Sequence, residues 1–422
     1  MTNREVTRIV DGFELGISNH WTTTNAAISS GTRRTGAYSL KLTAAGAGAI
    51  RASRSHTAGG EPGGRCYILL EQRPNQNLDI VGYGQGAGAT MYTGVSYNAA
   101  TGALRGYVYD GTYAYGTDGF QPDLDTWYRI EWRAIQPSGS QERVEWYING
   151  TVQPEYTRSG LGVHSTPGVT ILGDLNNAGV ATQGIIYYDD LLVLTTTGQA
   201  SGWLPDWPWG GGKGVVLRPN AEGTHSVPAD FTDNLGNSPP ASVYNRLDEV
   251  PASTALGDFV YQDTIAAGSY LEVDFEPLNV EATYWGGVQA YWGHQSDTFA
   301  SANFALKMFD PVNGLAQVLN AALNGFATVF AHERGVIAPS TYELGTITAL
   351  NSYILRMGYS NDVTPAEKLE YFLLLVDYPA ADDAVSIPSE QGDLDLRLLK
   401  VSISELPYQL QARTLGSPGP KE

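Results

Sequence analysis

The chain has 422 residues, a length that suits two domains of about 200 residues each. Its formal net charge of −19 argues against a protein that holds nucleic-acid phosphates, because such proteins need a basic surface. Only 16% of the residues are charged, whereas 42% are hydrophobic, and there are 49 glycines and 25 tyrosines. This composition is typical of close-packed β-strands joined by tight turns.

The N-terminal sequence Met-Thr-Asn-Arg-Glu-Val has no apolar run of signal-peptide length, and no stretch of the chain is apolar enough to span a membrane. We therefore expect a protein that is made in the cytoplasm and not inserted into a membrane. The single cysteine, Cys66, cannot form an internal disulfide and lies in the apolar run Cys66–Leu70. It is expected to be a small buried core residue, because no neighbour in sequence would lower its pKa.

The first half of the chain reads as strands and hairpins. Residues 128–133, Tyr-Arg-Ile-Glu-Trp-Arg, alternate between apolar and charged, which predicts a strand with one buried face and one solvent face. Residues 143–148 alternate likewise and run into Asn149-Gly150, a dipeptide that favours a type I′ hairpin turn. Asp110-Gly111 lies between two tyrosine-rich segments and predicts a second hairpin. Such strands form an antiparallel sandwich or barrel.

A change of composition marks a boundary in the middle of the chain. A predicted strand at residues 184–194 is followed by the segment Trp203-Leu-Pro-Asp-Trp-Pro-Trp-Gly-Gly-Gly-Lys-Gly214. Its tryptophans, prolines and glycines do not fit a regular element, so we interpret it as a linker. The tryptophans Trp203, Trp207 and Trp209 are expected to be buried against a sandwich, and a sugar-stacking platform is the alternative.

The second half begins again with strands. These are predicted at residues 214–218, 270–275 and 351–357, and the apolar run 370–378 predicts a fully covered central strand. Residues 394–401 alternate and are expected to end the sheet, and the tail 416–422 is expected to be an arm. Residues 315–324 have helical spacing, but the context favours a pair of strands, with a helix as the alternative.

Catalytic and metal-binding motifs are missing from the sequence. The histidines are scattered and form no HxH, HExxH or HxxxH pair, and we expect them in turns or at the surface. They are His20, His56, His164, His225, His294 and His332. No nucleophile elbow, P-loop or dinucleotide-binding glycine pattern occurs in a credible strand–helix setting.

Paired carboxylates are the nearest approach to an active site, because jelly-roll glycosidases place two acids on alternate positions of one strand. Asp393 and Asp395 have that spacing but lie in a short acidic turn. Asp189 and Asp190 are adjacent, so on a regular strand they would face opposite ways. This pair, or Asp248-Glu249, could hold a structural Ca²⁺, but strand-end and turn acids are the favoured interpretation. We therefore predict no catalytic, cofactor-binding or metal-binding residues and no cofactor.

Several motifs in order resemble a known family. Asp11-Gly-Phe-Glu14, Trp21, residues 28–36 and Ser39-Leu-Lys-Leu42 are similar to the opening of concanavalin A-like, laminin-G-like jelly rolls. Residues 127–132, 144–150 and 186–192 resemble later strands of that family, so the resemblance covers roughly residues 6–195. The order of segments after residue 189 resembles laminin-G-like virion proteins of bacteriophages. These are residues 203–209, 217–219, 244–251 and 258–261.

The fold expected from these observations is all-β, with two antiparallel jelly-roll β-sandwich domains. The expected boundaries are 1–198 for the laminin-G-like jelly roll, 199–213 for the linker, 214–405 for the second β-sandwich and 406–422 for a C-terminal arm.

The function that the resemblance implies is a non-enzymatic bacteriophage virion structural protein. It would be a tail-associated, fibre or capsid-surface decoration component, assembled in the host cytoplasm. It would act through contacts with other virion proteins and as a homo-oligomer. The alternative is a carbohydrate-binding host-adhesion module of the virion, whose aromatic side chains would stack on host surface glycans.

Overall fold

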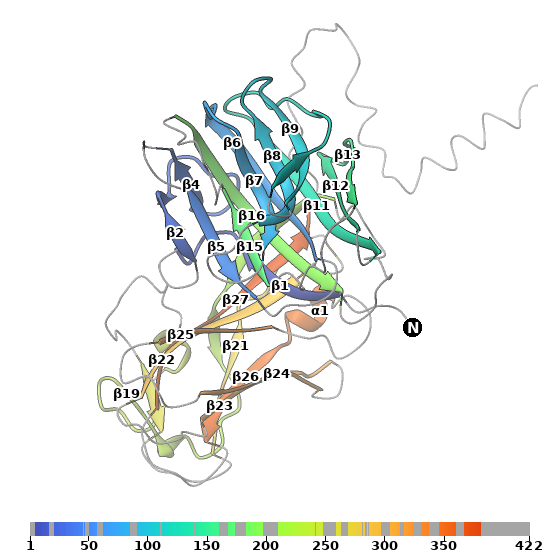
Figure 1. The fold of residues 1–422 in the computed structure, drawn as a ribbon. Helices are drawn as coiled ribbons and strands as arrows, with labels where there is room; N and C mark the ends of the chain where they lie inside the picture. The colour runs from blue at the N-terminus through green and yellow to red at the C-terminus, as the bar shows by residue number, and fades with distance from the viewer. Residues whose placement is uncertain are drawn as a thin grey trace, which may run out of the picture. The chain divides into compact units, whose positions relative to one another are not determined.

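A computed structural model gives the fold of the described residues, which all belong to one compact unit, Met1–Asp382. They are residues 5–16, 21–44, 46, 50–56, 62–84, 91–109, 112–138, 141–159, 168–173, 183–196, 210–240, 242–247, 259–262, 269–280, 282, 285, 287–296, 304–312, 316–323, 331–336, 346–359 and 367–380. Nearly all regular structure in these ranges is antiparallel β-sheet, and the prediction of an all-β sandwich fold is confirmed (Figure 1).

The first β-sandwich is made by strands between residues 5 and 196, in two sheets. Sheet A contains β1 (Glu5–Asp11), β3 (Ala26–Ser29), β4 (Ser39–Thr43), β6 (Pro62–Gln72), β11 (Trp127–Ser138), β12 (Gln141–Ile148), β13 (Thr151–Val152), β14 (Tyr156–Ser159) and β16 (Ile185–Thr196). Sheet B has the order β10-β9-β8-β7-β15-β5-β2. Its strands are β2 (Thr22–Thr24), β5 (Arg51–Ser55), β7 (Leu78–Gly84), β8 (Met91–Asn98), β9 (Ala103–Tyr109), β10 (Tyr113–Tyr115) and β15 (Val169–Leu172).

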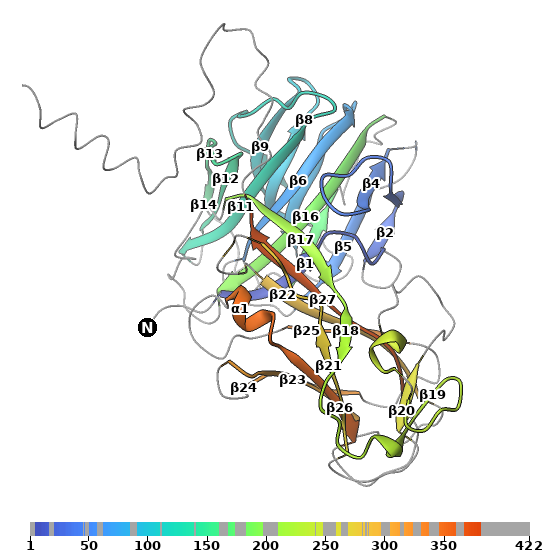
Figure 2. The same cartoon turned by 180° about the vertical axis from the view of Figure 1, so that it is seen from behind.

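The second β-sandwich is made by strands between residues 212 and 379 (Figure 2). Sheet C contains β17 (Gly212–Leu217), β19 (Phe231–Asp233), β20 (Val260–Gln262), β22 (Gly287–Ser296), β25 (Ala331–Val336) and β27 (Glu367–Pro379). Sheet D contains β18 (Pro219–Glu222), β21 (Leu271–Phe275), β23 (Phe304–Asp310), β24 (Ala316–Leu323) and β26 (Ile354–Tyr359). The helical turns are η1 (Pro228–Asp230), η2 (Tyr244–Arg246) and α1 (Ile347–Leu350). No helix in the described ranges has the length and apolar character needed to cross a membrane.

Apolar side chains at alternate positions along the strands fill the core of the first sandwich. Trp132 and Trp146 are fully buried between the sheets, and the Trp132 ring stacks on Tyr83 of sheet B with ring centres 5.6 Å apart. Gly64 makes room for this pair, because a Cβ atom there would lie 2.6 Å from the Trp132 ring. The predicted turn at Asn149-Gly150 is confirmed: φ is 48° at Asn149 and 79° at Gly150, the left-handed values that this turn needs.

Two strand predictions need correction. The charged face of residues 128–133 does not face solvent: Arg129 and Glu131 are buried and form an ion pair with a distance of 3.1 Å. The reason is tertiary, since the N–H of Gly210 donates to Glu131 across a distance of 2.9 Å and covers this face. Residues 315–324 contain one strand, β24, and not a strand pair or a helix. The predicted strand at 394–401, the C-terminal arm and the domain boundaries beyond residue 380 lie outside the described residues.

Candidate functional site

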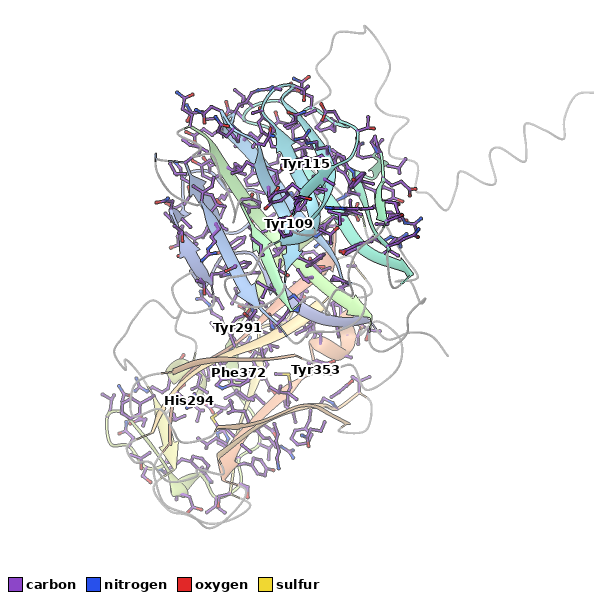
Figure 3. All side chains as sticks on the ribbon, in the orientation of Figure 1. Tyr109, Tyr115, Tyr291, His294, Tyr353 and Phe372 are labelled. Atoms are coloured by element: carbon purple, nitrogen blue, oxygen red, sulfur yellow. The ribbon has the colours of Figure 1, made fainter. Side chains whose placement is uncertain are left out.

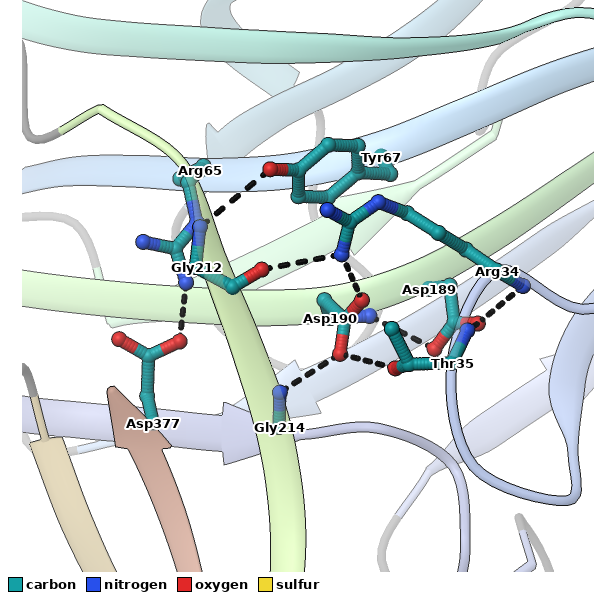
Figure 4. Close-up of polar contacts among 9 residues, drawn as sticks. All are labelled: Arg34, Thr35, Arg65, Tyr67, Asp189, Asp190, Gly212, Gly214 and Asp377. Atoms are coloured by element: carbon teal, nitrogen blue, oxygen red, sulfur yellow. Dashed lines mark hydrogen bonds and ion pairs between the residues drawn. The ribbon is translucent and has the colours of Figure 1, made fainter. Parts of the chain in front are cut away.

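The adjacent acids Asp189 and Asp190 lie on β16 and are 0% and 1% exposed. An irregularity in pairing between Asp189 and Leu192, with φ of 47° at Asp190, lets both carboxylates reach the loop that carries Arg34 and Thr35 (Figure 4). Asp189 accepts backbone N–H bonds from Arg34 at 2.8 Å and from Thr35 at 3.2 Å. The expectation that the two carboxylates face opposite ways is therefore wrong, because the strand is not regular here.

Asp190 joins the two sandwiches. It forms an ion pair with Arg34 at 2.6 Å and accepts the N–H of Gly214, at the start of the second sandwich, at 2.6 Å. Arg34 also donates to the carbonyl of Gly212 at 3.0 Å, and its guanidinium lies 3.5 Å from the ring centre of Tyr67. These contacts bind the first strand of sheet C to the outer face of sheet A (Figure 4).

A second ion pair lies in the same buried region. Arg65 of β6 binds Asp377 of β27, and both side chains are almost completely buried. Burial raises the pKa of Asp377 to about 6, in spite of the opposing charge of Arg65. Burial, followed by the charge of Asp190, raises the pKa of Asp189 to about 8.

A third polar contact and an apolar cluster complete the junction between the two sandwiches. Arg54 of β5 binds Asp11 at 2.8 Å and Gln289 of β22 at 2.8 Å, and it also donates to Tyr291 (labelled in Figure 3). Next to it, apolar side chains of both sandwiches pack in one cluster: Val10, Leu15, Leu192, Leu194, Tyr291, Leu373 and Leu375. The junction is closed to a substrate, so the acid pair has a structural role and is not a glycosidase-type pair.

The other acids and aromatic residues singled out in the sequence fall mostly outside the described residues. This holds for Asp393, Asp395, Asp248-Glu249 and the three linker tryptophans. Within the described part of the chain, no group of three or more His, Cys, Asp or Glu side chains could hold a metal ion. Cys66 is buried in the core, and burial raises the pKa of its thiol.

Among the histidines, His225 forms a hydrogen bond with each of its two ring nitrogens. Its Nε2 lies 2.9 Å from Glu222, and its Nδ1 accepts the N–H of Glu272 at 3.0 Å. Because Nδ1 accepts, Nε2 carries the proton and donates to Glu222. His225 therefore links β18 to β21 and is not positioned as a catalytic base.

A different group of side chains forms the best candidate site, and it lies on the outward face of sheet B. Tyr107 and Tyr109 alternate along β9, Tyr113 and Tyr115 alternate along β10, and the register pairs Tyr109 with Tyr113 and Tyr107 with Tyr115. All four rings therefore share one face of the hairpin. We call these four residues the tyrosine face (Tyr109 and Tyr115 are labelled in Figure 3).

The rings of the tyrosine face hold one another in place. The ring centres of Tyr109 and Tyr113 are 4.9 Å apart in an edge-to-face contact, and those of Tyr113 and Tyr115 are 5.8 Å apart with nearly parallel planes. Tyr107 is buried beneath them, whereas Tyr109, Tyr113 and Tyr115 are partly exposed. The result is a packed aromatic surface whose three outer rings are partly exposed.

Glycines in the neighbouring strands form the floor of this site. A Cβ atom at Gly82 would lie 2.6 Å from the Tyr107 hydroxyl, and one at Gly94 would lie 3.0 Å from the Tyr107 ring. The glycines therefore allow the Tyr107 ring to lie flat across β8 and β7. At its far end Tyr107 packs on Val169 and Ile171 of β15, which also point outward.

A row of polar side chains crosses the same face beside the tyrosines. Asp79 and Ser96 are paired in register, as are Ser96 and Arg105, so the three lie side by side on β7, β8 and β9. The Arg105 guanidinium lies 3.9 Å from the ring centre of Tyr115. This site was not predicted from the sequence, although its signal is present in the two Tyr-x-Tyr segments at residues 107–109 and 113–115.

Comparison with known proteins places the chain only by its fold. No family model matches the sequence, and no curated protein matches it. Among solved structures, it is similar to a glucuronan lyase from Trichoderma reesei, with 14% identity over 46% of this chain and 96% of that one and a TM-score of 0.32. An alginate lyase from Aplysia kurodai matches with 14% identity over 46% of this chain and 99% of that one and a TM-score of 0.33. A mutant sialidase from Trypanosoma rangeli matches with 14% identity over 42% of this chain and 28% of that one and a TM-score of 0.31.

These findings correct the functional prediction. The neighbours are polysaccharide lyases and sialidases, which are carbohydrate-processing enzymes, so the predictions of a non-enzymatic chain and of a bacteriophage virion structural protein are wrong. The family resemblance is confirmed only as far as a jelly-roll-like β-sandwich. Likeness at these TM-scores carries no argument about what this chain binds or does, so its function has to be argued from its own side chains.

Proposed function

We propose that this chain is a carbohydrate-active protein that binds a polysaccharide on the tyrosine face of sheet B. The observation that carries the proposal is the arrangement of Tyr109, Tyr113 and Tyr115. These three rings are partly exposed, lie on one sheet face and are fixed by contacts with one another. A concanavalin A-like jelly roll remains our proposal for the family of the first sandwich.

The physical argument rests on the two-sided character of sugars and of tyrosine. A sugar ring presents C–H groups on its faces and hydroxyl groups around its edge. A tyrosine ring offers a flat apolar surface for the first and a hydroxyl for the second. Because a tyrosine has few rotatable bonds, fixing it costs little conformational entropy. The ring contacts of the tyrosine face lower that cost further, since they already hold the rings before a ligand arrives.

The carboxylate of this face is not open to a substrate, because Asp79 in the polar row is 4% exposed. We therefore assign to the tyrosine face the binding of a polysaccharide through its partly exposed rings.

Binding of the purified chain to a panel of soluble neutral and acidic polysaccharides tests this proposal. Tyr113→Ala and Tyr115→Ala should each weaken binding by about tenfold, the loss of one stacking contact. Tyr38→Ala is the matched control, because Tyr38 is 39% exposed and lies in the loop before β4. The same incubations are monitored for new reducing ends and for the ultraviolet absorbance of unsaturated products, which distinguishes hydrolysis from elimination. Binding that both tyrosine variants and the control share equally, or no binding at all, would overturn the proposal.

A further inference from the structure

An arginine lies at each end of the tyrosine face. Toward the start of β9, the Arg105 guanidinium lies 3.9 Å from the ring centre of Tyr115. At the tip of the hairpin, Arg158 of β14 donates to the carbonyl of Thr112 at 2.6 Å and to its hydroxyl at 3.2 Å. Thr112 directly precedes Tyr113, so this contact ties the tip of the hairpin to sheet A. The two arginines thus bring positive charge next to the partly exposed rings.

The charge of Arg105 has a carboxylate beside it, that of Asp118. Partial burial opposes the ionisation of Asp118, but hydrogen bonds from Thr101 at 2.7 Å and from Asn98 at 3.0 Å, followed by the charge of Arg105, lower its pKa overall. Asp118 is therefore ionised at neutral pH. The guanidinium that stacks on the tyrosine face is accompanied by a negative charge and is not a free cation.

The charge of Arg158 has a carboxylate beside it in the same way. Glu142 of β12 and Arg158 are directly paired in register, so their side chains lie next to each other on one face of sheet A. Asp79 adds a third carboxylate, because the register places it with Ser96 and Arg105 in the polar row. Three carboxylates therefore lie near the tyrosine face against two guanidinium groups.

Other cationic side chains are scarce in this part of the sequence. No lysine occurs between Lys41 and Lys213, and the chain as a whole has a net charge of −19. An acidic polymer would therefore approach a molecule of its own sign, and the arginines that it would meet at the described tyrosine face already have carboxylates beside them. The groups that remain for a ligand are aromatic rings and phenolic hydroxyls, which carry no charge.

From this arrangement we infer that the ligand of the tyrosine face is an uncharged polysaccharide, held by contacts with the rings and by hydrogen bonds between phenolic and sugar hydroxyls. The inference rests on the proposed function, because it assigns a ligand class to the same face. A neutral sugar needs no countercharge, and its hydroxyls can both donate to and accept from a phenol. An acidic sugar unit would lose part of the hydration of its carboxylate here without gaining an ion pair.

The test compares two forms of one polymer that differ in charge, polygalacturonate and its methyl ester. At about 0.01 M salt, where charges act over about 30 Å, the wild-type chain should bind the methyl ester at least about tenfold more tightly. At about 1 M salt the same distance falls to about 3 Å, so this preference should shrink, and the affinity for the ester should stay within about twofold. Isothermal titration calorimetry measures both affinities at both salt concentrations.

Asp118→Asn tests whether the carboxylate beside Arg105 excludes acidic ligands. The substitution keeps an oxygen that can accept the Thr101 hydroxyl but removes the charge, so the preference for the ester should fall by about threefold. Asp125→Asn is the matched control and should keep the preference of the wild type. It removes the same charge at an exposed position shortly before β11, where asparagine tolerates the φ of 56°. Circular dichroism and the thermal midpoint show whether each variant is folded.

The outcomes separate the two proposals. Equal or tighter binding of polygalacturonate at low salt would overturn the uncharged-ligand inference and leave glycan binding by the tyrosine face intact. The same follows if Asp118→Asn and Asp125→Asn have the same preference. Across the wider panel, the inference stands when the tightest ligand is uncharged and falls when it is acidic. If no polysaccharide binds at all, the proposed function fails, and this inference fails with it.

Discussion

Arg65 and Asp377 form a buried ion pair although 312 positions separate them in the chain. Arg65 belongs to a strand of the first sandwich and Asp377 to the central strand of sheet C. Since a buried charge needs its partner, each sandwich stabilises a charge of the other. This relationship makes the two sandwiches depend on one another.

Breaking this pair should be costly. Arg65→Met removes the countercharge of Asp377 and is expected to lower the free energy of unfolding at pH 8 by about 3–5 kcal/mol, because a carboxylate is then buried without a partner. Glu155→Gln is the control, because Glu155 is paired with Arg143 at the surface at 3.9 Å, and its loss should change stability by less than about 1 kcal/mol. Urea unfolding followed by tryptophan fluorescence measures both values. Equal effects of the two substitutions would show that the buried pair contributes no more to the free energy of unfolding than the surface pair does.

Stability should depend on pH with a defined sign. The pKa of Asp377 is raised by burial to about 6 and that of Asp189 to about 8, from a usual value of 3.8. Between pH 3.8 and each raised pKa, the folded state therefore holds more protons than the unfolded state. The stability that these protons contribute is lost as the pH rises, up to about 6 for Asp377 and up to about 8 for Asp189. Burial opposes the charge of Arg65, but the nearby carboxylates, Asp377 first, raise its pKa overall, so Arg65 stays charged.

Unfolding titrations at pH values between 4 and 8 check this sign. Around pH 6, Asp377→Asn should flatten the curve, because the variant has no carboxyl to titrate at that position. A wild-type stability that increases steadily from pH 4 to pH 8 would contradict the prediction.

The glycine floor of the candidate site should be sensitive to a single methyl group. In Gly94→Ala, the new Cβ would lie 2.1 Å from the carbonyl oxygen of Val81 and 2.7 Å from the Cα of Gly82. The backbone has to shift, so we expect a loss of about 1–3 kcal/mol in stability and weaker glycan binding through displacement of Tyr107. Gly31→Ala is the control, because nothing lies within 4 Å of a Cβ there. Thermal unfolding and glycan binding of the two variants should differ clearly, and equal behaviour would show that the floor is not tightly packed.

The hairpin at Asn149 offers a test of local structure. Asn149→Ala places a less tolerant residue at φ of 48° and removes the side-chain oxygen that accepts the N–H of Arg129 at 2.9 Å. The expected loss of stability is about 1–2 kcal/mol. Asn149→Asp keeps that acceptor and should lose less, and chemical denaturation of both variants measures the difference. A larger loss for Asp than for Ala would show that the side-chain acceptor is not what matters at this turn.

Local pattern was enough to determine several parts of this protein. The alternation in residues 143–148, the turn at Asn149-Gly150 and the apolar run of β27 each depend on contacts between near neighbours or on simple burial, and all three were predicted from sequence. The all-β class follows from the same local preferences. These preferences arise from backbone sterics and side-chain shape, which the sequence carries directly.

Tertiary structure alone decided which charges are buried and which face carries the candidate site. Arg129 and Glu131 look like solvent residues in sequence and are buried because Gly210 is brought against them. Tyr107 and Ile171 are 64 positions apart in the sequence and pack together only through the strand order of sheet B. Strand order and register depend on long-range pairing, whose free energy is summed over the whole sheet and is not visible in any short segment.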